Sequence, residues 1–204
     1  MVAAIVLSAG LSARMGGVPK GLLRFDERDR FVTRIIRTLN EAGITDVVVV
    51  LGHEAVSVAA VVEQSGLSAR CVVNKEFREG QFSSLRAGLD AIDRPEVEAV
   101  LLSLVDAPLF SASTVRAVAQ RFEQTQAPVV RVVRGSEHGH PVLIGRALFE
   151  AIRHADPSFG AKPVVRGHAS QAGDVPVDDA GAFVDIDTPA DYANLRDQLG
   201  RYGP

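Results

Sequence analysis

The sequence predicts a doubly wound α/β fold, in which a mostly parallel sheet carries helices on both faces. Short apolar runs rich in β-branched residues show little polar alternation, which is typical of strands covered on both faces. These runs lie at residues 3–7, 46–51, 99–104 and 128–133. Amphipathic segments with helical spacing separate them, and this alternation of strand and helix implies right-handed crossovers between parallel strands.

The first predicted helix covers residues 31–42, where the apolar side chains share one face and Gly43 supplies a stop signal. Further helices are predicted at residues 54–64, 83–92, 112–124 and 189–199. Residues 155–182 are rich in Gly, Pro, Ser and Asp and give the weakest signal for regular structure. We interpret that segment as a substrate loop or an excursion from the sheet.

The composition predicts a single domain spanning residues 1–204, because 47% of the residues are hydrophobic and can build one sizeable core. The 22 Lys and Arg are scattered among 25 Asp and Glu, which gives no electrostatic footprint for a nucleic-acid partner. Cys71 has no partner for an internal disulfide, and residues 1–7 lack the features of a secretory signal. We expect a cytoplasmic protein with no membrane partner, since no apolar run approaches the roughly 18 residues that span a bilayer.

The loop after the first strand carries the strongest functional signal. In open α/β sheets, ligands bind beyond the carboxyl ends of the strands. The small residues Ser8, Ala9 and Gly10 let backbone amides approach a ligand and form an anion-binding nest. Arg14 offers a bidentate fork for phosphate oxygens and Lys20 a compact charge. The loop therefore predicts polyphosphate binding; the alternative is a flexible surface loop with solvated cations.

Two better-known phosphate motifs do not fit this loop. A P-loop requires G-x-x-x-x-G-K-[ST], whereas Lys20 follows Pro19 and precedes Gly21. The dinucleotide fingerprint G-x-G-x-x-G is absent between Gly10 and Gly17. Neither standard motif therefore describes the loop.

Asp106 closes the apolar run LLSLVDAP and predicts a magnesium ligand, because a carboxylate at a strand's carboxyl end lies beside the expected phosphates. The alternative is a cap for the turn at Pro108 or for the helix near Ser111. In VDIDTPADY, Asp185 and Asp187 alternate along an extended segment and point to one side. Asp191 falls in the first turn of the last predicted helix, where we interpret it as structural.

Two further segments have competing local interpretations. Ser83, in GQFSSLRAGLDAI, is a candidate N-cap for the helix that follows. His140 lies in HGHPVLI, before an apolar run, and no Cys or third His stands at zinc-ligand spacing. A histidine that caps backbone groups in a turn is one reading of His140.

The stretch LSAGLSARMGGVPK closely resembles the signature loop of the MobA-like nucleotidyltransferases, which have a nucleotide-diphospho-sugar transferase-like fold. The resemblance runs through D-x-P and G-H-P to D-x-D-T-P near the end. It implies that the loop cradles a nucleoside triphosphate through Leu7, Ser8, Ala9 and Gly10. It also implies catalytic roles for Arg14 and Lys20 on the phosphates and for Asp106, which binds Mg²⁺ together with Asp187 or Asp185.

The same resemblance implies that the start of the helix near residue 83 lies beside the nucleotide base and that His140 contacts the acceptor substrate. Base-reading candidates are Gly80, Gln81, Ser83 and Ser84. Members of the family transfer a nucleoside monophosphate from a triphosphate to a phosphorylated acceptor and release pyrophosphate. The elements S-A-G, G-Q-x-S-S-L and G-H-P-V are most similar to enzymes that attach CMP to molybdopterin, so the resemblance implies CTP as substrate.

The resemblance thus implies molybdenum cofactor cytidylyltransferase activity. A molybdoenzyme or its chaperone is then an expected partner of the protein. Phe82 and Ala107 depart from the family pattern and indicate a different acceptor as one possibility. Two other functions compete with this one. Some MobA-like chains are named nicotine blue oxidoreductases, in which the same pocket would hold NAD(P)H, although the missing dinucleotide fingerprint argues against it. The third hypothesis is a non-catalytic nucleotide-binding protein.

Overall fold

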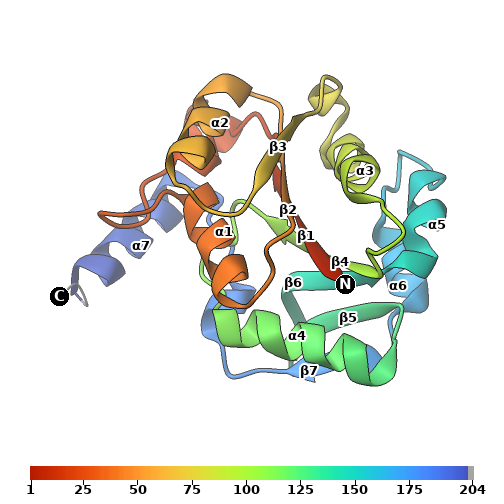
Figure 1. The fold of residues 1–204 in the computed structure, drawn as a ribbon. Helices are drawn as coiled ribbons and strands as arrows, with labels where there is room; N and C mark the ends of the chain where they lie inside the picture. The colour runs from red at the N-terminus through yellow and green to blue at the C-terminus, as the bar shows by residue number, and fades with distance from the viewer. Residues whose placement is uncertain (202–204) are drawn as a thin grey trace.

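A computed structural model describes residues 1–201 and contains one seven-stranded sheet with the order β3-β2-β1-β4-β6-β5-β7 (Figure 1). β6 runs antiparallel to both of its neighbours, and the remaining pairings are parallel. The strands are β1 (Val2–Ser8), β2 (Val47–Leu51), β3 (Arg70–Val73), β4 (Ala99–Leu104), β5 (Val129–Arg134), β6 (Glu137–Gly145) and β7 (Asp174–Pro176). The predicted fold, an α/β sheet that is mostly parallel, is confirmed.

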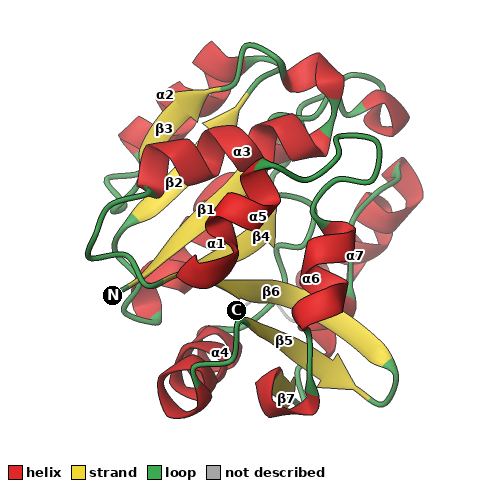
Figure 2. Ribbon diagram, turned by 90° about the vertical axis from the view of Figure 1, so that its right-hand side faces the viewer, coloured by secondary structure: helices red, strands yellow, loops and turns green. Residues whose placement is uncertain are grey.

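The helices cover both faces of this sheet, as predicted. They are α1 (Phe31–Glu41), α2 (Ala55–Gln64), α3 (Gln81–Ile92), α4 (Ala112–Thr125), α5 (Phe149–Arg153), α6 (Lys162–His168) and α7 (Pro189–Arg201). Buried residues of α1, α2, α4 and α7 form one apolar cluster with the sheet. Residues of α3, α5 and α6 pack against the other face, and these helices lie in front of the strands in Figure 2. Within residues 1–201, none of these helices combines the length and apolar character needed to cross a bilayer.

The central strand β1 shows why its sequence is a continuous apolar run. Ala4 and Val6 belong to the first cluster, whereas Ala3, Ile5 and Leu7 belong to the second. Successive side chains of a strand point to opposite faces, so residues 3–7 are apolar at every position because both faces of the strand are covered.

The segment 155–182 is partly regular, which the sequence did not predict. It contains α6 and then β7, which pairs in parallel with β5 at the sheet edge. A side chain on Gly173 would place its Cβ 1.9 Å from the carbonyl oxygen of Val129, so only glycine permits this approach. The excursion from the sheet therefore returns to it.

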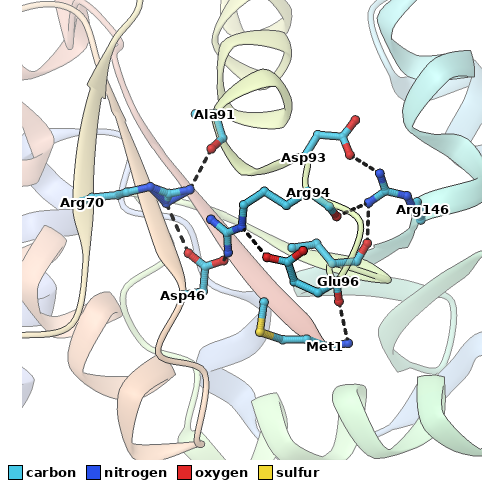
Figure 3. Close-up of polar contacts among 9 residues, drawn as sticks. Met1, Asp46, Arg70, Ala91, Asp93, Arg94, Glu96 and Arg146 are labelled. Atoms are coloured by element: carbon cyan, nitrogen blue, oxygen red, sulfur yellow. Dashed lines mark hydrogen bonds and ion pairs between the residues drawn. The ribbon is translucent and has the colours of Figure 1, made fainter.

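A polar network fastens the amino ends of the strands, opposite the edge predicted to bind ligand (Figure 3). Asp46 accepts hydrogen bonds from Arg70 (3.2 Å) and Arg94 (2.5 Å). Asp93 binds Arg146 and also Arg153, the latter at 2.6 Å. These contacts tie the connection between α3 and β4 to the neighbouring strands and to α5.

Replacing Asp93 by asparagine is expected to lower the free energy of unfolding at pH 7 by about 1–2 kcal/mol, because two charge-assisted contacts are lost. The hydrogen bond from Arg153 and the charge of Arg146 hold the pKa of Asp93 below its ordinary value. A lowered pKa stabilises the fold above the unfolded-state value, and this contribution is lost as pH falls. Urea titrations should therefore show a constant deficit of Asp93→Asn from about pH 7 to about pH 5, and a deficit that shrinks as pH falls below the unfolded-state pKa of about 4.

The control is Asp90→Asn, because the Asp90 side chain is 67% exposed and binds Arg153 with one oxygen at 2.9 Å. It should cost only a few tenths of a kcal/mol. An Asp93→Asn deficit that does not change with pH would contradict the ionic origin of the effect.

Candidate functional site

The loop that follows β1 is folded onto the protein and is not a loose surface segment. The carbonyl oxygen of Ser12 accepts hydrogen bonds from the amides of Met15 (2.8 Å) and Gly17 (3.3 Å). The Ser12 hydroxyl accepts a hydrogen bond from the amide of Lys20 (3.1 Å). Met15 is 8% exposed and packs into the first apolar cluster. These contacts fix where the backbone presents Lys20.

Gly21 explains how Lys20 comes close to the end of β1. A Cβ at position 21 would lie 2.7 Å from the Ser8 hydroxyl oxygen, so a larger residue would require that hydroxyl or the loop to shift. The Lys20 side chain is 12% exposed, whereas that of Arg14 is 73% exposed. The alternative interpretation, a loose loop with solvated cations, is therefore wrong for Lys20. Only the exposed side chain of Arg14 agrees with it.

Lys20 lies between two carboxylates from distant parts of the chain. Its Nζ is 2.9 Å from Asp106 Oδ2 and 2.5 Å from Asp187 Oδ1. Arg14 Nη1 lies 3.1 Å from the other oxygen of Asp187. Two carboxylates thus converge on one positive charge, an ion-pair arrangement that the sequence did not predict, although it did predict Asp106 at the carboxyl end of a strand.

The ionisation of these groups follows from the contacts. Partial burial disfavours charge on Lys20, but hydrogen bonds to Asp187 and Asp106 outweigh it and raise its pKa. The hydrogen bond from Lys20 holds the pKa of Asp187 below its ordinary value. The lysine and Asp187 are therefore charged together near neutral pH.

Backbone contacts bring Asp106 to this position. The amide of Val105 donates to the carbonyl of Leu7 (3.1 Å), which extends the pairing of β1 with β4, and the amide of Ile186 donates to the carbonyl of Asp106 (2.7 Å). The alternative role for Asp106, a cap on α4, is wrong. Ser111 is the N-cap, and the carboxylate that binds its amide (2.9 Å) is that of Asp179, which the sequence analysis missed.

The late acidic segment separates into three roles. Asp187 faces Lys20 and Arg14. Asp191 accepts hydrogen bonds from the amide (2.8 Å) and the hydroxyl of Thr188 at the start of α7, so its structural interpretation is confirmed. Asp185 does not line the pocket that contains Lys20. Sequence spacing alone left Asp185 and Asp187 equivalent.

A pocket of about 420 Å³ connects these residues. Its charged wall consists of Arg14, Lys20, Asp106 and Asp187. A second wall, here called the α3 wall, consists of Phe77, Arg78, Gly80, Gln81 and Ser84. The predicted residues that line the pocket are Leu7, Ser8, Ala9, Gly10, Arg14, Lys20, Gly80, Gln81, Ser84, Asp106 and Asp187.

Ser83 lies outside the pocket lining, and its predicted N-cap role is wrong. α3 begins at Gln81 with Gly80 as N-cap, so Ser83 falls inside the first turn. The Ser83 hydroxyl faces the carbonyl oxygens of Glu76 (2.9 Å) and Gly80 (2.8 Å).

His140 also lies outside the pocket lining, on β6. Within residues 1–201 its Nδ1 is buried without a hydrogen-bond partner, so it does not cap a turn through that atom. Burial lowers the pKa of His140, against the opposing charges of Asp185 and Asp106. Burial raises the pKa of Asp185, while the nearby His140 works in the other direction.

Phe77 and Arg78 line the pocket although sequence reasoning did not select them. They form the short turn Phe77–Glu79 before Gly80, and the Arg78 guanidinium lies 5.4 Å from the centre of the Phe77 ring. The sequence signal that could have indicated these two residues is an aromatic residue next to a cation, shortly before the start of a helix.

Comparison with known proteins gives a family for this pocket. Residues 4–173 match the model of the MobA-like NTP transferase domain. The chain belongs to this family. Nicotine blue oxidoreductase of Paenarthrobacter nicotinovorans is 33% identical over 162 residues, which cover 74% of each protein.

Solved structures share the fold of this MobA-like chain over its whole length. Rv0371c of Mycobacterium tuberculosis H37Rv is 25% identical with a TM-score of 0.79, over 97% of this chain and 98% of that one. A further structure of Rv0371c is described as a complex with manganese. A nucleotidyl transferase from Methanothermobacter is 24% identical with a TM-score of 0.81, over 100% of this chain and 99% of that one. These similarities confirm the predicted family and the nucleotidyltransferase fold.

Replacing Lys20 by methionine is expected to raise the pKa of Asp187, because the hydrogen bond that lowers it is removed. Carboxyl-carbon NMR titrations of the wild type and of Lys20→Met measure the shift. Arg14→Met is the matched control: Arg14 contacts Asp187 from a more exposed position, so its loss should raise the pKa less. An Asp187 pKa that is equal in wild type and Lys20→Met would show that the contact is absent in solution.

Proposed function

We propose that this chain is a nucleotidyltransferase that moves a nucleoside monophosphate from a triphosphate to a phosphorylated small-molecule acceptor and releases pyrophosphate. The observation that carries the proposal is the charged wall, where Lys20 and Arg14 lie beside the carboxylates of Asp106 and Asp187 in one pocket. The membership of the MobA-like NTP transferase family supports the same reaction class.

In this reaction, an oxygen of the acceptor phosphate bonds to the α-phosphorus of the triphosphate. The bond from the α-phosphorus to the oxygen that bridges to the β-phosphate breaks, and pyrophosphate leaves with that electron pair. Lys20 and Arg14 stabilise the departing charge, and the small residues Ser8, Ala9 and Gly10 let backbone amides approach the phosphates. The reaction requires no nucleophilic side chain, and Cys71 lies on β3, outside the pocket lining.

The carboxylates fit a divalent cation. Within residues 1–201, Asp106 Oδ1 is buried without a hydrogen-bond partner, and Asp106 and Asp187 already hold one positive charge between them. No group of three or more His, Cys, Asp or Glu in the described residues is arranged to hold a metal. Phosphate oxygens and water would complete the shell, as is usual for Mg²⁺. When bound to Asp106 and Asp187, Mg²⁺ would neutralise charge on the α- and β-phosphates. The description of an Rv0371c structure as a complex with manganese supports the use of a divalent cation in this fold.

CTP is the proposed nucleotide and molybdopterin the proposed acceptor, on the strength of the S-A-G, G-Q-x-S-S-L and G-H-P-V elements. A molybdoenzyme or its chaperone would receive the product. His140 would contribute to acceptor binding from β6, beside Asp185, at the edge of the sheet where Asp106 also lies.

A second candidate function is the oxidation of NAD(P)H with transfer of hydride to a dye-like acceptor. The 33% identity to a protein named nicotine blue oxidoreductase favours it. The two functions share phosphate recognition by the loop at residues 8–20, since both nucleoside triphosphates and NAD(P)H carry phosphates.

One assay panel separates these functions. Pyrophosphate release is measured with CTP, GTP, ATP or UTP, in the presence of Mg²⁺ and molybdopterin, beside NADH and NADPH oxidation with an electron acceptor. We expect release with CTP above that with the other triphosphates. NADPH consumption without triphosphate turnover would refute the transferase proposal, and nucleotide binding without any turnover would favour the non-catalytic hypothesis.

Asp106→Asn is expected to lower kcat/KM for nucleotidyl transfer by about 1,000-fold, because the loss of a metal ligand removes several kcal/mol of charge stabilisation. Thermal unfolding should change little, since the residue follows the end of β4 and caps no helix. Asp178→Asn is the control, as Asp178 is exposed and lies outside the pocket that contains Lys20. Full activity of Asp106→Asn would refute the role of this carboxylate.

A further inference from the structure

Asn74 is a buried polar residue that connects three segments beside the pocket. It follows β3 directly, and 6% of its surface is exposed. Its side-chain Nδ2 donates to the hydroxyls of Ser83 (2.9 Å) and Ser84 (3.0 Å), and its Oδ1 accepts from the amide of Glu76 (2.9 Å). Both donor hydrogens of this amide and one acceptor site of its oxygen are thus engaged by the segment 76–84.

This segment forms the α3 wall of the pocket. Phe77 supplies an aromatic face, Gln81 an amide and Ser84 a hydroxyl, which together suit a planar heterocycle with donor and acceptor edges. The charged wall formed by Arg14, Lys20, Asp106 and Asp187 is separate in sequence from this one. The two walls therefore differ in chemistry, with ionic groups on one and mainly neutral groups on the other.

The two serines held by Asn74 use their protons differently. The Ser83 hydroxyl faces two backbone carbonyl oxygens, which accept its proton. Ser84 Oγ accepts from Asn74, and Ser84 lines the pocket. Because the Asn74 amide donates to Ser84, the Ser84 proton is available for an acceptor atom of a ligand.

We propose that Asn74 is a positioning residue for nucleobase recognition, which fixes the α3 wall and makes Ser84 a donor toward an acceptor atom of the base. The inference rests on the proposed function in one respect, namely that the ligand of the pocket is a nucleotide. Asn74 itself does not line the pocket and acts through Ser84 and the turn Phe77–Glu79.

Asn74→Asp tests the polarity of this contact while it preserves the shape of the side chain. A carboxylate only accepts hydrogen bonds, so the Ser84 hydroxyl would turn its proton toward residue 74 and present lone pairs to the ligand. Ser84→Ala removes the donor directly and retains the rest of the wall, which keeps the test valid if Asn74→Asp folds poorly.

Asn40 provides a matched control. Its Nδ2 donates to the carbonyl oxygens of Ile44 (3.0 Å) and Ser68 (3.1 Å), and its Oδ1 accepts from the amide of Ser68 (2.9 Å). It is thus an asparagine that connects local segments in the same manner but lies outside the pocket lining. Asn40→Asp reproduces the chemical change without altering the α3 wall.

The experiment measures calorimetric binding of CTP, GTP and inorganic tripolyphosphate, each with Mg²⁺, to the wild type and the three variants. Asn74→Asp and Ser84→Ala should bind the preferred nucleotide about 10-fold more weakly and lose the preference between bases, because one directed hydrogen bond is lost. Tripolyphosphate affinity should stay unchanged, since the charged wall binds it. Asn40→Asp should match the wild type for all three ligands.

Two results would overturn the inference alone. One is an unchanged base preference in both Asn74→Asp and Ser84→Ala. The other is an equal loss of tripolyphosphate and nucleotide affinity in both variants, which would mean general structural damage. A wild-type protein that binds CTP and GTP no more tightly than tripolyphosphate would overturn base recognition and the proposed function together, so the two failures are distinguishable.

Discussion

The parallel pairing of β1 with β4 is the constraint on which the site depends. Their register places Leu7 opposite Leu104, so the two strands end together, and the loop at residues 8–20 emerges beside Asp106. β6 runs in the opposite direction, with Val142 opposite Leu102, so its early residue His140 reaches the same edge. Strand direction and register thus bring segments from the first and middle parts of the chain to this edge. The late segment is held there by the hydrogen bond from the amide of Ile186 to the carbonyl of Asp106 (2.7 Å).

The charges at this edge are costly to assemble and are held ready by their contacts. Two carboxylates that face one another repel, and taking Lys20 out of water is unfavourable, so the cluster is weak support for stability. In the proposed function, its geometry would serve polyphosphate binding, because the charge of the ligand would meet groups already oriented by the loop. Stability comes instead from the two apolar clusters on the faces of the sheet and from polar networks such as that of Asp93 at the opposite edge.

The sequence predicted the parts of the fold that depend on local periodicity. Doubly covered strands and amphipathic helices are periodic, so β1, β2, β4 and α1 could be read directly. The short strand β7 could not, because it depends on the close approach that Gly173 permits to β5. Likewise, the choice between Asp185 and Asp187 depends on the path of an irregular segment. The N-cap of α3 is Gly80 and not Ser83, whose hydroxyl binds the carbonyl oxygen of Glu76 in the preceding turn. These outcomes are set by tertiary contacts.

The two walls of the pocket explain why similarity of the first loop does not by itself determine the reaction. In the proposed function the charged wall binds phosphates, which nucleoside triphosphates and NAD(P)H have in common, so a chain 33% identical to a protein named nicotine blue oxidoreductase could share this wall while acting on another ligand. Discrimination must come from groups that meet the rest of the molecule. On the α3 wall these groups are mainly neutral, so their interaction with a ligand depends on the direction of single hydrogen bonds. The buried amide of Asn74 sets this direction for Ser84. Changes at that wall can therefore alter ligand choice while leaving the phosphate site and the fold intact.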